Sequence, residues 1–521
     1  MSDEGNFYDL FARHVREDPG APCLETPDGE VWTRRRMDAQ SARYANALAQ
    51  AGCTPGDRVA VQVEKSPQAL ALYLACVRAG YVFLPLNTAY QPAELAYLIS
   101  DAQPRVFIHH GDRPEVLERL DPGKTPSRVF SFDAHGAGSL ERLFAPGGDV
   151  FRTVPCHGDE VAALLYTSGT TGRPKGAMLS HRAMSHSALT LMGQWQFSQA
   201  DVLLHALPIF HGHGLFISSN VALVAGARLL FQPRFDAGEI VAALPRATVF
   251  MGVPTYYHRL LADDRLTPAS CDRIRLFTSG SAALSAEIHS DFETRTGHRI
   301  VERYGATETM ILCSNPLDGE RRPGSVGLPL PGVELRIADA EDQSLPTGTI
   351  GMIQVRGPGL FNGYWALPEQ TRQEFSADGY FRTGDLGCFA ADGYVAITGR
   401  AKDLIISGGY NVYPAEVETA IDEVGNVLES AVVAMSHPDF GEAVVAFVVP
   451  VDPATPPTPI QIIQWCKARL ANYKVPKQVH IVGKLPRNTM GKILKAQLRA
   501  WLTEPGPALQ QSERPETRAP E

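Results

Sequence analysis

The 521-residue sequence lacks a long apolar run, a secretion pattern and an excess of basic residues. No eighteen consecutive residues are uninterruptedly apolar, so we expect no membrane-spanning helix. The opening Met-Ser-Asp-Glu-Gly-Asn has no basic segment followed by an apolar one, which argues against a signal peptide. The formal net charge of −9 argues against a nucleic-acid-binding surface, because such surfaces carry clustered positive charge.

The eight cysteines are scattered and form no C-x-x-C pair. This spacing predicts free, mostly packed thiols in a reducing cytoplasm rather than a disulfide framework. The length exceeds what one hydrophobic core usually supports, so two or more domains are expected. We therefore expect a cytoplasmic protein that acts on small molecules, with no nucleic-acid or membrane partner, as a monomer or weak homodimer.

Strand-like and helix-like segments alternate through the first 330 residues. Apolar strand patterns occur at 58–63, 81–86 and 106–109, with helical patterns such as 33–51 and 68–79 between them. The pattern repeats with strands near 202–207, 227–231, 247–254 and 274–278, and with an apolar helix expected at 214–225. This alternation predicts an α/β fold of two related layers, whose largely parallel sheets are covered on both faces.

The pattern changes near residue 333. Short alternating segments with the turn dipeptides Asp378-Gly379 and Asp392-Gly393 predict a small antiparallel β subdomain over 333–399. We expect a large domain over 1–399, a polar hinge at 400–402 and a small mobile α+β domain over 403–503. Residues 504–521 are rich in Pro, Glu, Gln and Arg without periodicity, which predicts a disordered tail.

One glycine-rich stretch, Tyr166-Thr-Ser-Gly-Thr-Thr-Gly-Arg-Pro-Lys-Gly176, directly follows an apolar strand pattern. Its glycines let backbone N–H groups approach a ligand closely, and its hydroxyls and lysine suit a polyphosphate. It is not the common P-loop, because Pro174 stands where that motif requires glycine. The candidate phosphate-binding residues are Thr167, Ser168, Gly169, Thr170, Thr171, Gly172 and Lys175.

Downstream segments supply residues suited to a nucleotide and its metal. Small residues after the strand at 274–278 leave room for a flat ring, and a Tyr-Gly pair suits purine stacking. Thr307 can donate to a phosphate, Glu308 can hold Mg²⁺ through oxygen, and Asp385 can accept two ribose hydroxyls. The other nucleotide candidates are Gly280, Ser281, Ala282, Glu302, Arg303, Tyr304 and Gly305.

These segments, in this order, resemble the motifs of the adenylate-forming superfamily, which includes acyl-CoA synthetases, peptide-synthetase adenylation domains and luciferases. The resemblance extends over about residues 6–500. It implies ATP and CoA as co-substrates and Mg²⁺ held by Glu308. It also implies a contact between Thr307 and the α-phosphate, and a ribose held by Asp385 with Arg400 behind it.

The small domain carries three further matches to this superfamily. Lys402 falls at the hinge about which the small domain rotates, and Gly408, Gly409 and Tyr410 match the segment that helps build the CoA tunnel. Lys492, in Leu-Pro-Arg-Asn-Thr-Met-Gly-Lys, matches the lysine that binds both the acid carboxylate and the α-phosphate. Its charge would offset negative charge that develops during adenylation.

The segment Leu-Pro-Ile-Phe-His-Gly-His-Gly-Leu-Phe, residues 207–216, bears on the acid. By the resemblance, His211 gates the acyl pocket beside the reacting carboxylate. A zinc site at His211 and His213 would need further ligands, and no third cluster is visible nearby. A diacid requires a second cation, because an unpaired buried carboxylate costs several kcal/mol. Arg234 and Arg275 are the candidates, although Arg234 could instead form a surface ion pair with Asp236.

Several of these segments, with Pro-Arg-Phe-Asp and Met-Gly-Val-Pro-Thr-Tyr-Tyr, look like those of malonyl-CoA synthetases. That resemblance implies that malonate, ATP and CoA give malonyl-CoA, AMP and pyrophosphate through a malonyl-adenylate, with methylmalonate as a second candidate acid. It implies that Arg234 pairs with the distal carboxylate.

Three alternatives remain from the sequence: a CoA ligase for an aryl or another short-chain acid, a module that loads a carrier protein, and a nucleotide-binding pseudoenzyme. No carrier-domain pattern follows Lys495, which disfavours the second. The presence of Lys175, Glu308, Asp385 and Lys492 disfavours the third.

Overall fold

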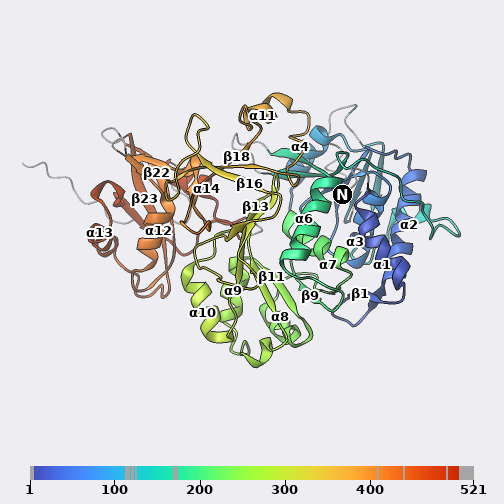
Figure 1. Cartoon of the computed structure of the whole chain (residues 1–521), viewed down its shortest axis with the longest axis horizontal. Helices are drawn as coiled ribbons and strands as arrows, with labels where there is room; N and C mark the ends of the chain where they lie inside the picture. The colour runs from blue at the N-terminus through green and yellow to red at the C-terminus, as the bar shows by residue number, and fades with distance from the viewer. Residues whose placement is uncertain are drawn as a thin grey trace, which may run out of the picture. The chain divides into compact units, whose positions relative to one another are not determined.

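The computed structural model describes residues 5–111, 118, 123, 126–167, 174–407, 410–437, 441–488 and 491–503 (Figure 1). The chain divides into a first unit, Met1–Leu335 with Val355–Phe381, and a second unit, Arg336–Gln354 with Arg382–Glu521. This division differs from the predicted boundary near 400, and the hinge at 400–402 stays a prediction. The phosphate-loop residues 168–173, the pair Gly408-Gly409 and the tail 504–521 lie outside the described residues.

A six-stranded sheet in the first unit carries the segment that precedes the phosphate loop. Its strands run in the order β6-β5-β3-β4-β7-β8 and are parallel, except that β7 and β8 pair antiparallel. Most of their residues are buried, as expected for strands covered on both faces. The strands are β3 (Arg58–Gln62), β4 (Val82–Pro85), β5 (Val106–His109), β6 (Arg128–Ser131), β7 (Val161–Thr167) and β8 (Lys175–Ser180).

A nine-stranded sheet in the same unit carries the other nucleotide and acid candidates. Its order is β15-β14-β13-β12-β11-β9-β10-β1-β2, and the strands from β13 to β1 are parallel to their neighbours. The strands are β1 (Pro22–Glu25), β2 (Val31–Thr33), β9 (Val202–His205), β10 (Arg228–Phe231), β11 (Val249–Gly252), β12 (Leu276–Ser279), β13 (Val301–Ala306), β14 (Met310–Ser314) and β15 (Leu328–Pro329). The predicted α/β fold is therefore confirmed.

The helices of the first unit begin and end much as the sequence predicts. For example, Thr33 caps its helix by accepting a hydrogen bond from the N–H of Arg36. The helices are α1 (Tyr8–Glu17), α2 (Arg34–Gln50), α3 (Pro67–Arg78), α4 (Pro92–Ala102), α6 (His181–Gln194), α7 (Asn220–Ala225), α8 (Ala237–Ala243), α9 (Pro254–Leu261), α10 (Ala286–Thr296) and α11 (Pro368–Gln373).

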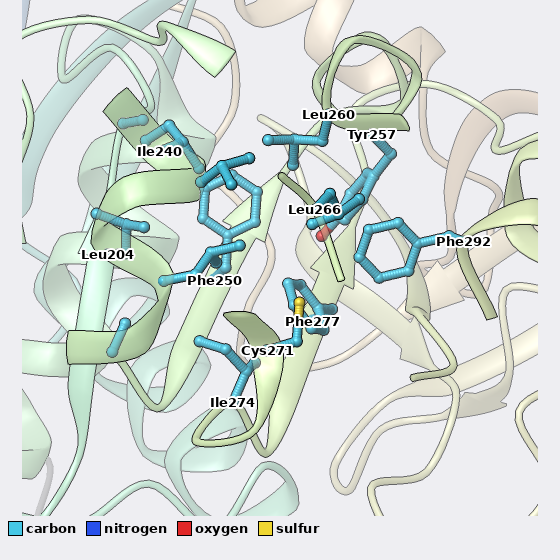
Figure 2. Packing of buried hydrophobic residues seen from close by; sticks show 14 of the residues in the cluster. Leu204, Ile240, Phe250, Tyr257, Leu260, Leu266, Cys271, Ile274, Phe277 and Phe292 are labelled. Atoms are coloured by element: carbon cyan, nitrogen blue, oxygen red, sulfur yellow. The ribbon is translucent and has the colours of Figure 1, made fainter. Parts of the chain in front are cut away.

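An aromatic core supports β11 and β12 from the side of α8, α9 and α10 (Figure 2). Phe277 of β12 lies edge-to-face against Phe292 of α10, with ring centroids 4.9 Å apart, and Tyr257 of α9 lies 5.1 Å from Phe292. The Tyr257 hydroxyl donates to the carbonyl of Thr278 at 2.6 Å. This packing fixes the carboxyl end of β12, where the predicted ring-binding segment begins.

The segment predicted as one apolar helix over 214–225 has a different start. Residues His213–Ser219 form a π-helix, and the α-helical part, α7, begins only at Asn220. Single π turns occur frequently at functional sites, because they change the direction of a side chain within a helix. Here the π-helix begins at one of the two histidines of the predicted acid segment.

The second unit contains a five-stranded sheet in which β23 pairs with β20, β22 and β24. A four-stranded antiparallel sheet, in the order β16-β17-β18-β19, accounts for the predicted β subdomain and belongs mostly to this unit. Its strands are β16 (Glu334–Ala338), β17 (Gly351–Arg356), β18 (Phe381–Phe389) and β19 (Val395–Arg400). The other elements are β20 (Ile405–Ser407), β21 (Tyr410–Val412), α12 (Pro414–Asp422), β22 (Val427–His437), β23 (Gly441–Pro450), α13 (Pro459–Lys467), β24 (Gln478–Ile481) and α14 (Lys495–Thr503).

Candidate functional site

The phosphate loop connects two antiparallel strands whose ends face each other. Thr167, the last residue of β7, pairs in register with Lys175, the first residue of β8. The predicted contacts of Ser168, Gly169, Thr170, Thr171 and Gly172 lie outside the described residues. The two flanking residues are described, and both have contacts within the protein.

Lys175 is buried, with 5% of its surface exposed. Its Nζ lies 3.2 Å from Oε1 of Glu374, which follows α11, and 4.7 Å from the ring centre of Tyr364. In this arrangement its charge is already paired inside the protein, which differs from the free point charge that the sequence suggested. A direct contact with phosphate stays a prediction.

Glu308 follows β13 in a turn and is half-buried. Its Oε1 accepts two hydrogen bonds, from the Thr167 hydroxyl at 3.2 Å and from the Tyr364 hydroxyl at 3.0 Å. Mg²⁺ is commonly held by one or two carboxylates together with substrate phosphates, so a half-buried carboxylate beside the phosphate loop fits this ion. In the described part of the chain no three His, Cys, Asp or Glu side chains gather as a metal cluster. Thr307, next to Glu308, is also half-buried.

The segment after β12 needs glycine for a steric reason. A Cβ on Gly280 would meet the guanidinium of Arg303 at 2.3–2.5 Å, so only glycine leaves room for that side chain. Ser281 has a positive φ of 70°, which is uncommon for a non-glycine residue. Its hydroxyl lies 3.1 Å from Nδ1 of His213. Ala282 follows in the same bend and is half-buried.

Arg303 is a buried charged residue of β13. It is 5% exposed, and neither Nε nor Nη2 has a hydrogen-bond partner among the described residues. Burial lowers the pKa of its guanidinium to about 10. An unpaired buried cation is costly, so this position calls for an anion. The sequence interpretation had placed Arg303 among the nucleotide contacts and did not consider it for the acid.

Burial and the charge of Arg303 lower the pKa of two histidines, His211 and His213. Burial, and then Arg303, lower the pKa of His211 to about 4 and that of His213 well below its usual value, so both are neutral at pH 7. The N–H of His213 donates to Nδ1 of His211 at 3.2 Å. The proton of neutral His211 is therefore on Nε2, where it can donate to a ligand oxygen.

The neighbours of Arg303 on β13 have different contacts. Glu302 accepts a hydrogen bond from the N–H of Leu284 at 3.1 Å, and burial raises its pKa to about 7. A Cβ on Gly305 would lie 1.9 Å from the carbonyl oxygen of Met310, so this glycine permits the close β13–β14 hairpin. Tyr304 is buried.

Arg275, the second candidate for the acid, binds protein groups in the structure, and its assignment to the acid stays a prediction. Its Nε and Nη2 bind the two carboxylate oxygens of Asp201 at 2.7 and 2.8 Å, and its Nη1 donates to the carbonyl of Trp195 at 2.9 Å. These bonds hold it at the amino end of β12, opposite the end that leads to Gly280. Its guanidinium is used to join β9 and β12.

Arg234 lies beyond the end of β10 and is exposed. The alternative interpretation, an ion pair with Asp236, is not found among the described residues. Asp236 instead caps α8 by accepting from the N–H of Glu239 at 3.1 Å. The assignment of Arg234 to a substrate carboxylate stays a prediction.

In the second unit, Asp385 and Arg400 stand opposite each other on β18 and β19. Nε of Arg400 lies 2.6 Å from Oδ1 of Asp385, and the aspartate side chain is only 5% exposed. The predicted pairing of these two residues is thus present. A carboxylate fixed in this way is oriented for hydroxyl groups of a ligand.

Lys492 is exposed overall, yet desolvation and the nearby Arg400 and Lys402 lower its pKa to about 8, while Asp385 and Asp403 act in the opposite direction. Its backbone is fixed by reciprocal hydrogen bonds with Asn488 at 2.9 Å. Tyr410 is 61% exposed and stacks on Tyr473 with centroids 4.7 Å apart. The roles predicted for Lys402, Tyr410 and Lys492 are not decided by these contacts.

Two models of known families match the chain. The model of the AMP-binding enzymes matches residues 11–365, and that of the C-terminal domain of AMP-binding enzymes matches residues 416–492. The chain therefore belongs to the AMP-binding enzyme family. This finding supports the resemblance to adenylate-forming enzymes and accounts for the large and small α/β parts.

Curated relatives of similar identity differ in their acids. A malonate–CoA ligase of Arabidopsis thaliana is 34% identical over 483 residues, covering 87% of this chain and 79% of the relative. An indoleacetate–CoA ligase of Aromatoleum aromaticum is 34% identical over 494 residues, covering 94% of this chain and 96% of the relative. Among solved structures, ATP-bound MatB from Rhodopseudomonas palustris is 47% identical with a TM-score of 0.92, covering 95% of this chain and 99% of that one.

Together these matches establish an AMP-forming acid–CoA ligase, with ATP and CoA as substrates, and leave the acid open. No helix within the described ranges has the length and apolar character needed to cross a bilayer.

Sequence reasoning missed Tyr364 and Glu374, which contact Glu308 and Lys175, and it missed the unpaired state of Arg303. The first two lie about 190 residues from the phosphate loop, so no local pattern links them to it. For Arg303 a signal exists, because it lies in a segment that forms a buried strand, and arginine is rarely fully buried without a partner.

Proposed function

We propose that this ligase activates malonate, with methylmalonate as a second candidate, and converts it to the CoA thioester through an acyl-adenylate. The observation that carries this proposal is the buried guanidinium of Arg303, whose Nε and Nη2 have no hydrogen-bond partner among the described residues, beside the neutral His211 and His213. A monocarboxylate has one carboxylate, which is consumed in the reaction. A diacid keeps a second one, which would compensate the Arg303 charge.

The energetic argument favours a small anionic acid over an aryl acid. With an apolar substrate the Arg303 charge would stay buried and unpaired in the complex, which costs several kcal/mol. With malonate the charge is paired, and bidentate carboxylate binding is the geometry for which arginine is suited. The relatives named for malonate support the choice, and those named for indoleacetate and ferulate make a test necessary.

We infer that Arg303, rather than Arg234, receives the distal carboxylate. Arg234 is exposed, so solvent would weaken an ion pair with a carboxylate there. At the buried Arg303 the carboxylate would compensate a positive charge that is costly in the free enzyme. Arg234 then has at most a role in attracting the diacid from solution. Variants at the two positions separate these assignments.

In the first step the near carboxylate attacks the α-phosphorus of ATP and pyrophosphate leaves. We assign Thr307 to the α-phosphate, Lys492 to the charge shared by the carboxylate and the α-phosphate, and Asp385 with Arg400 to the ribose. We assign the Nε2–H of His211 to the reacting carboxylate, to which it would donate a hydrogen bond. Glu308 would hold Mg²⁺, which offsets phosphate charge when bound.

In the second step the CoA thiol attacks the acyl carbon, the thioester bond forms, and AMP leaves with the electron pair of the broken bond. We assign Tyr410, with Gly408 and Gly409, to the passage of the thiol and Lys402 to the hinge. Such domain movements set the order of the two half-reactions in many enzymes.

The test is ATP–pyrophosphate exchange across malonate, methylmalonate, acetate, octanoate, benzoate and indoleacetate. We expect the highest kcat/KM with malonate, and faster exchange with any monocarboxylate would contradict the proposal. The carrier-loading alternative predicts exchange without transfer of the acyl group to CoA, so detection of malonyl-CoA by mass spectrometry decides that point.

A further inference from the structure

Tyr364 occupies a central position in the phosphate end of the first unit. Its hydroxyl donates to Oε1 of Glu308 at 3.0 Å, and its ring lies 4.7 Å from Nζ of Lys175. It is 7% exposed, and burial together with the charge of Glu308 raises the pKa of its hydroxyl, which stays a neutral donor. One side chain thus contacts both the candidate metal ligand and the end of the phosphate loop.

The backbone around Tyr364 is fixed to the same two elements. The N–H of Trp365 donates to the carbonyl of Gly176 at 2.7 Å, and the N–H of Met178 donates to the carbonyl of Gly363 at 3.0 Å. The N–H of Phe361 donates to the carbonyl of Glu308 at 2.8 Å. Residues 361–365 therefore act as a short extra strand that runs beside β8 and holds the Glu308 turn at one end.

Both hydrogen bonds to the Glu308 carboxylate go to the same oxygen. Thr167 and Tyr364 donate to Oε1, and no donor to Oε2 is found among the described residues. A carboxylate held by one oxygen keeps the other for a cation, which is the usual arrangement of an oriented metal ligand. Removing one of the two donors would let the carboxylate rotate.

We propose that Tyr364 is a positioning residue that orients Glu308 to present Oε2 to the metal–nucleotide complex. In this proposal Tyr364 acts through Glu308, to which its hydroxyl donates. The inference rests on the proposed role of Glu308 and is independent of which acid is activated. It predicts a defect in metal-dependent nucleotide binding rather than a general loss of folding.

The test uses the full-length enzyme with Tyr364→Phe, which removes the hydroxyl and keeps the ring against Lys175. Hydrogen bonds to charged groups are among the stronger ones in proteins, so we expect roughly tenfold weaker calorimetric affinity for a non-hydrolysable ATP analogue in the presence of Mg²⁺. The affinity measured with EDTA should stay within about twofold of the wild type, because Tyr364 acts only through the metal ligand.

Tyr380→Phe is the matched control, since it also removes a hydroxyl that donates to a carboxylate, Oε2 of Glu334 at 3.2 Å. It should change neither affinity. Glu308→Gln tests the foundation: if it leaves the Mg²⁺ dependence unchanged, the role proposed for Glu308 fails. If Glu308→Gln removes that dependence but Tyr364→Phe leaves it intact, or lowers both affinities equally, the positioning role of Tyr364 is overturned.

Discussion

Replacing Arg303 by methionine separates a substrate-binding role from a structural one, because the two predict opposite changes in stability. Burial lowers the guanidinium pKa from its usual value to about 10, which corresponds to about 3 kcal/mol of cost for the charged form in the free enzyme. Methionine retains most of the apolar stem and removes that cost. The free variant should therefore be as stable as the wild type, or more stable by up to about 3 kcal/mol.

Catalysis with malonate should change in the other direction. A buried ion pair that loses one partner costs about 3–5 kcal/mol, so kcat/KM for malonate should fall by at least about a hundredfold. Exchange with propionate, which has no distal carboxylate, should not fall. The ratio of the two kcat/KM values is the decisive quantity, since a general folding defect would lower both.

The assays are ATP–pyrophosphate exchange with both acids and urea denaturation at pH 7.5, with Arg234→Met as the matched control. The exposed Arg234 should leave the malonate value within about threefold of the wild type. If kcat/KM for malonate is retained in Arg303→Met but falls in Arg234→Met, our reasoning is refuted. The assignment of Arg234, made from the sequence, would then be restored. Equal losses with both acids, together with lower stability, would make Arg303 a structural residue.

Three further predictions concern buried or crowded charges. Glu374→Gln should lower the free energy of unfolding in urea by about 1–3 kcal/mol, which is more than Lys175→Met should. The reason is that Glu374→Gln leaves the 5%-exposed Lys175 cation unpaired, whereas Lys175→Met leaves a carboxylate whose side chain is 32% exposed. A larger loss with Lys175→Met would contradict the pairing. Glu302 has a raised pKa of about 7, so its contribution to stability is present below its unfolded pKa and is lost as pH rises through 7. Glu302→Gln should therefore match the wild type at pH 5 and exceed its stability at pH 8 by about 2–3 kcal/mol, and a pH-independent difference would count against this explanation. Because the pKa of Lys492 is about 8, kcat/KM for adenylation should decline as pH rises through 8. Lys492→Arg should move this decline to higher pH. A decline at the same pH in the variant would mean that another group titrates.

Local pattern in the sequence was sufficient for the order of strands and helices and for the position of the phosphate loop. Apolar strand patterns and capping residues such as Thr33 are local signals, and the structure follows them closely. The pairing of Asp385 with Arg400 was also accessible, since both lie in recognisable motifs on what prove to be adjacent strands. The π-helical start at His213 was not, because a segment of 7 residues is too short for its hydrophobic spacing to distinguish a π-helix from an α-helix.

The contacts that the sequence could not reveal join residues that are far apart in the sequence and meet only in the folded chain. Arg275 binds Asp201 across 74 residues, directly before the first residue of β12. Glu374 pairs with Lys175 across 199 residues. The lack of a hydrogen-bond partner for Nε and Nη2 of Arg303 within the described ranges can be recognised only from the folded structure.

The central claim, that Arg303 holds the far end of a diacid, is tested most directly by a crystal structure with a non-hydrolysable malonyl-adenylate analogue. The account predicts that both oxygens of the distal carboxylate lie within hydrogen-bond distance of the Arg303 guanidinium, with His211 beside the acyl carbonyl. A distal carboxylate bound to Arg234 or facing solvent, with Arg303 still unpaired, would contradict it.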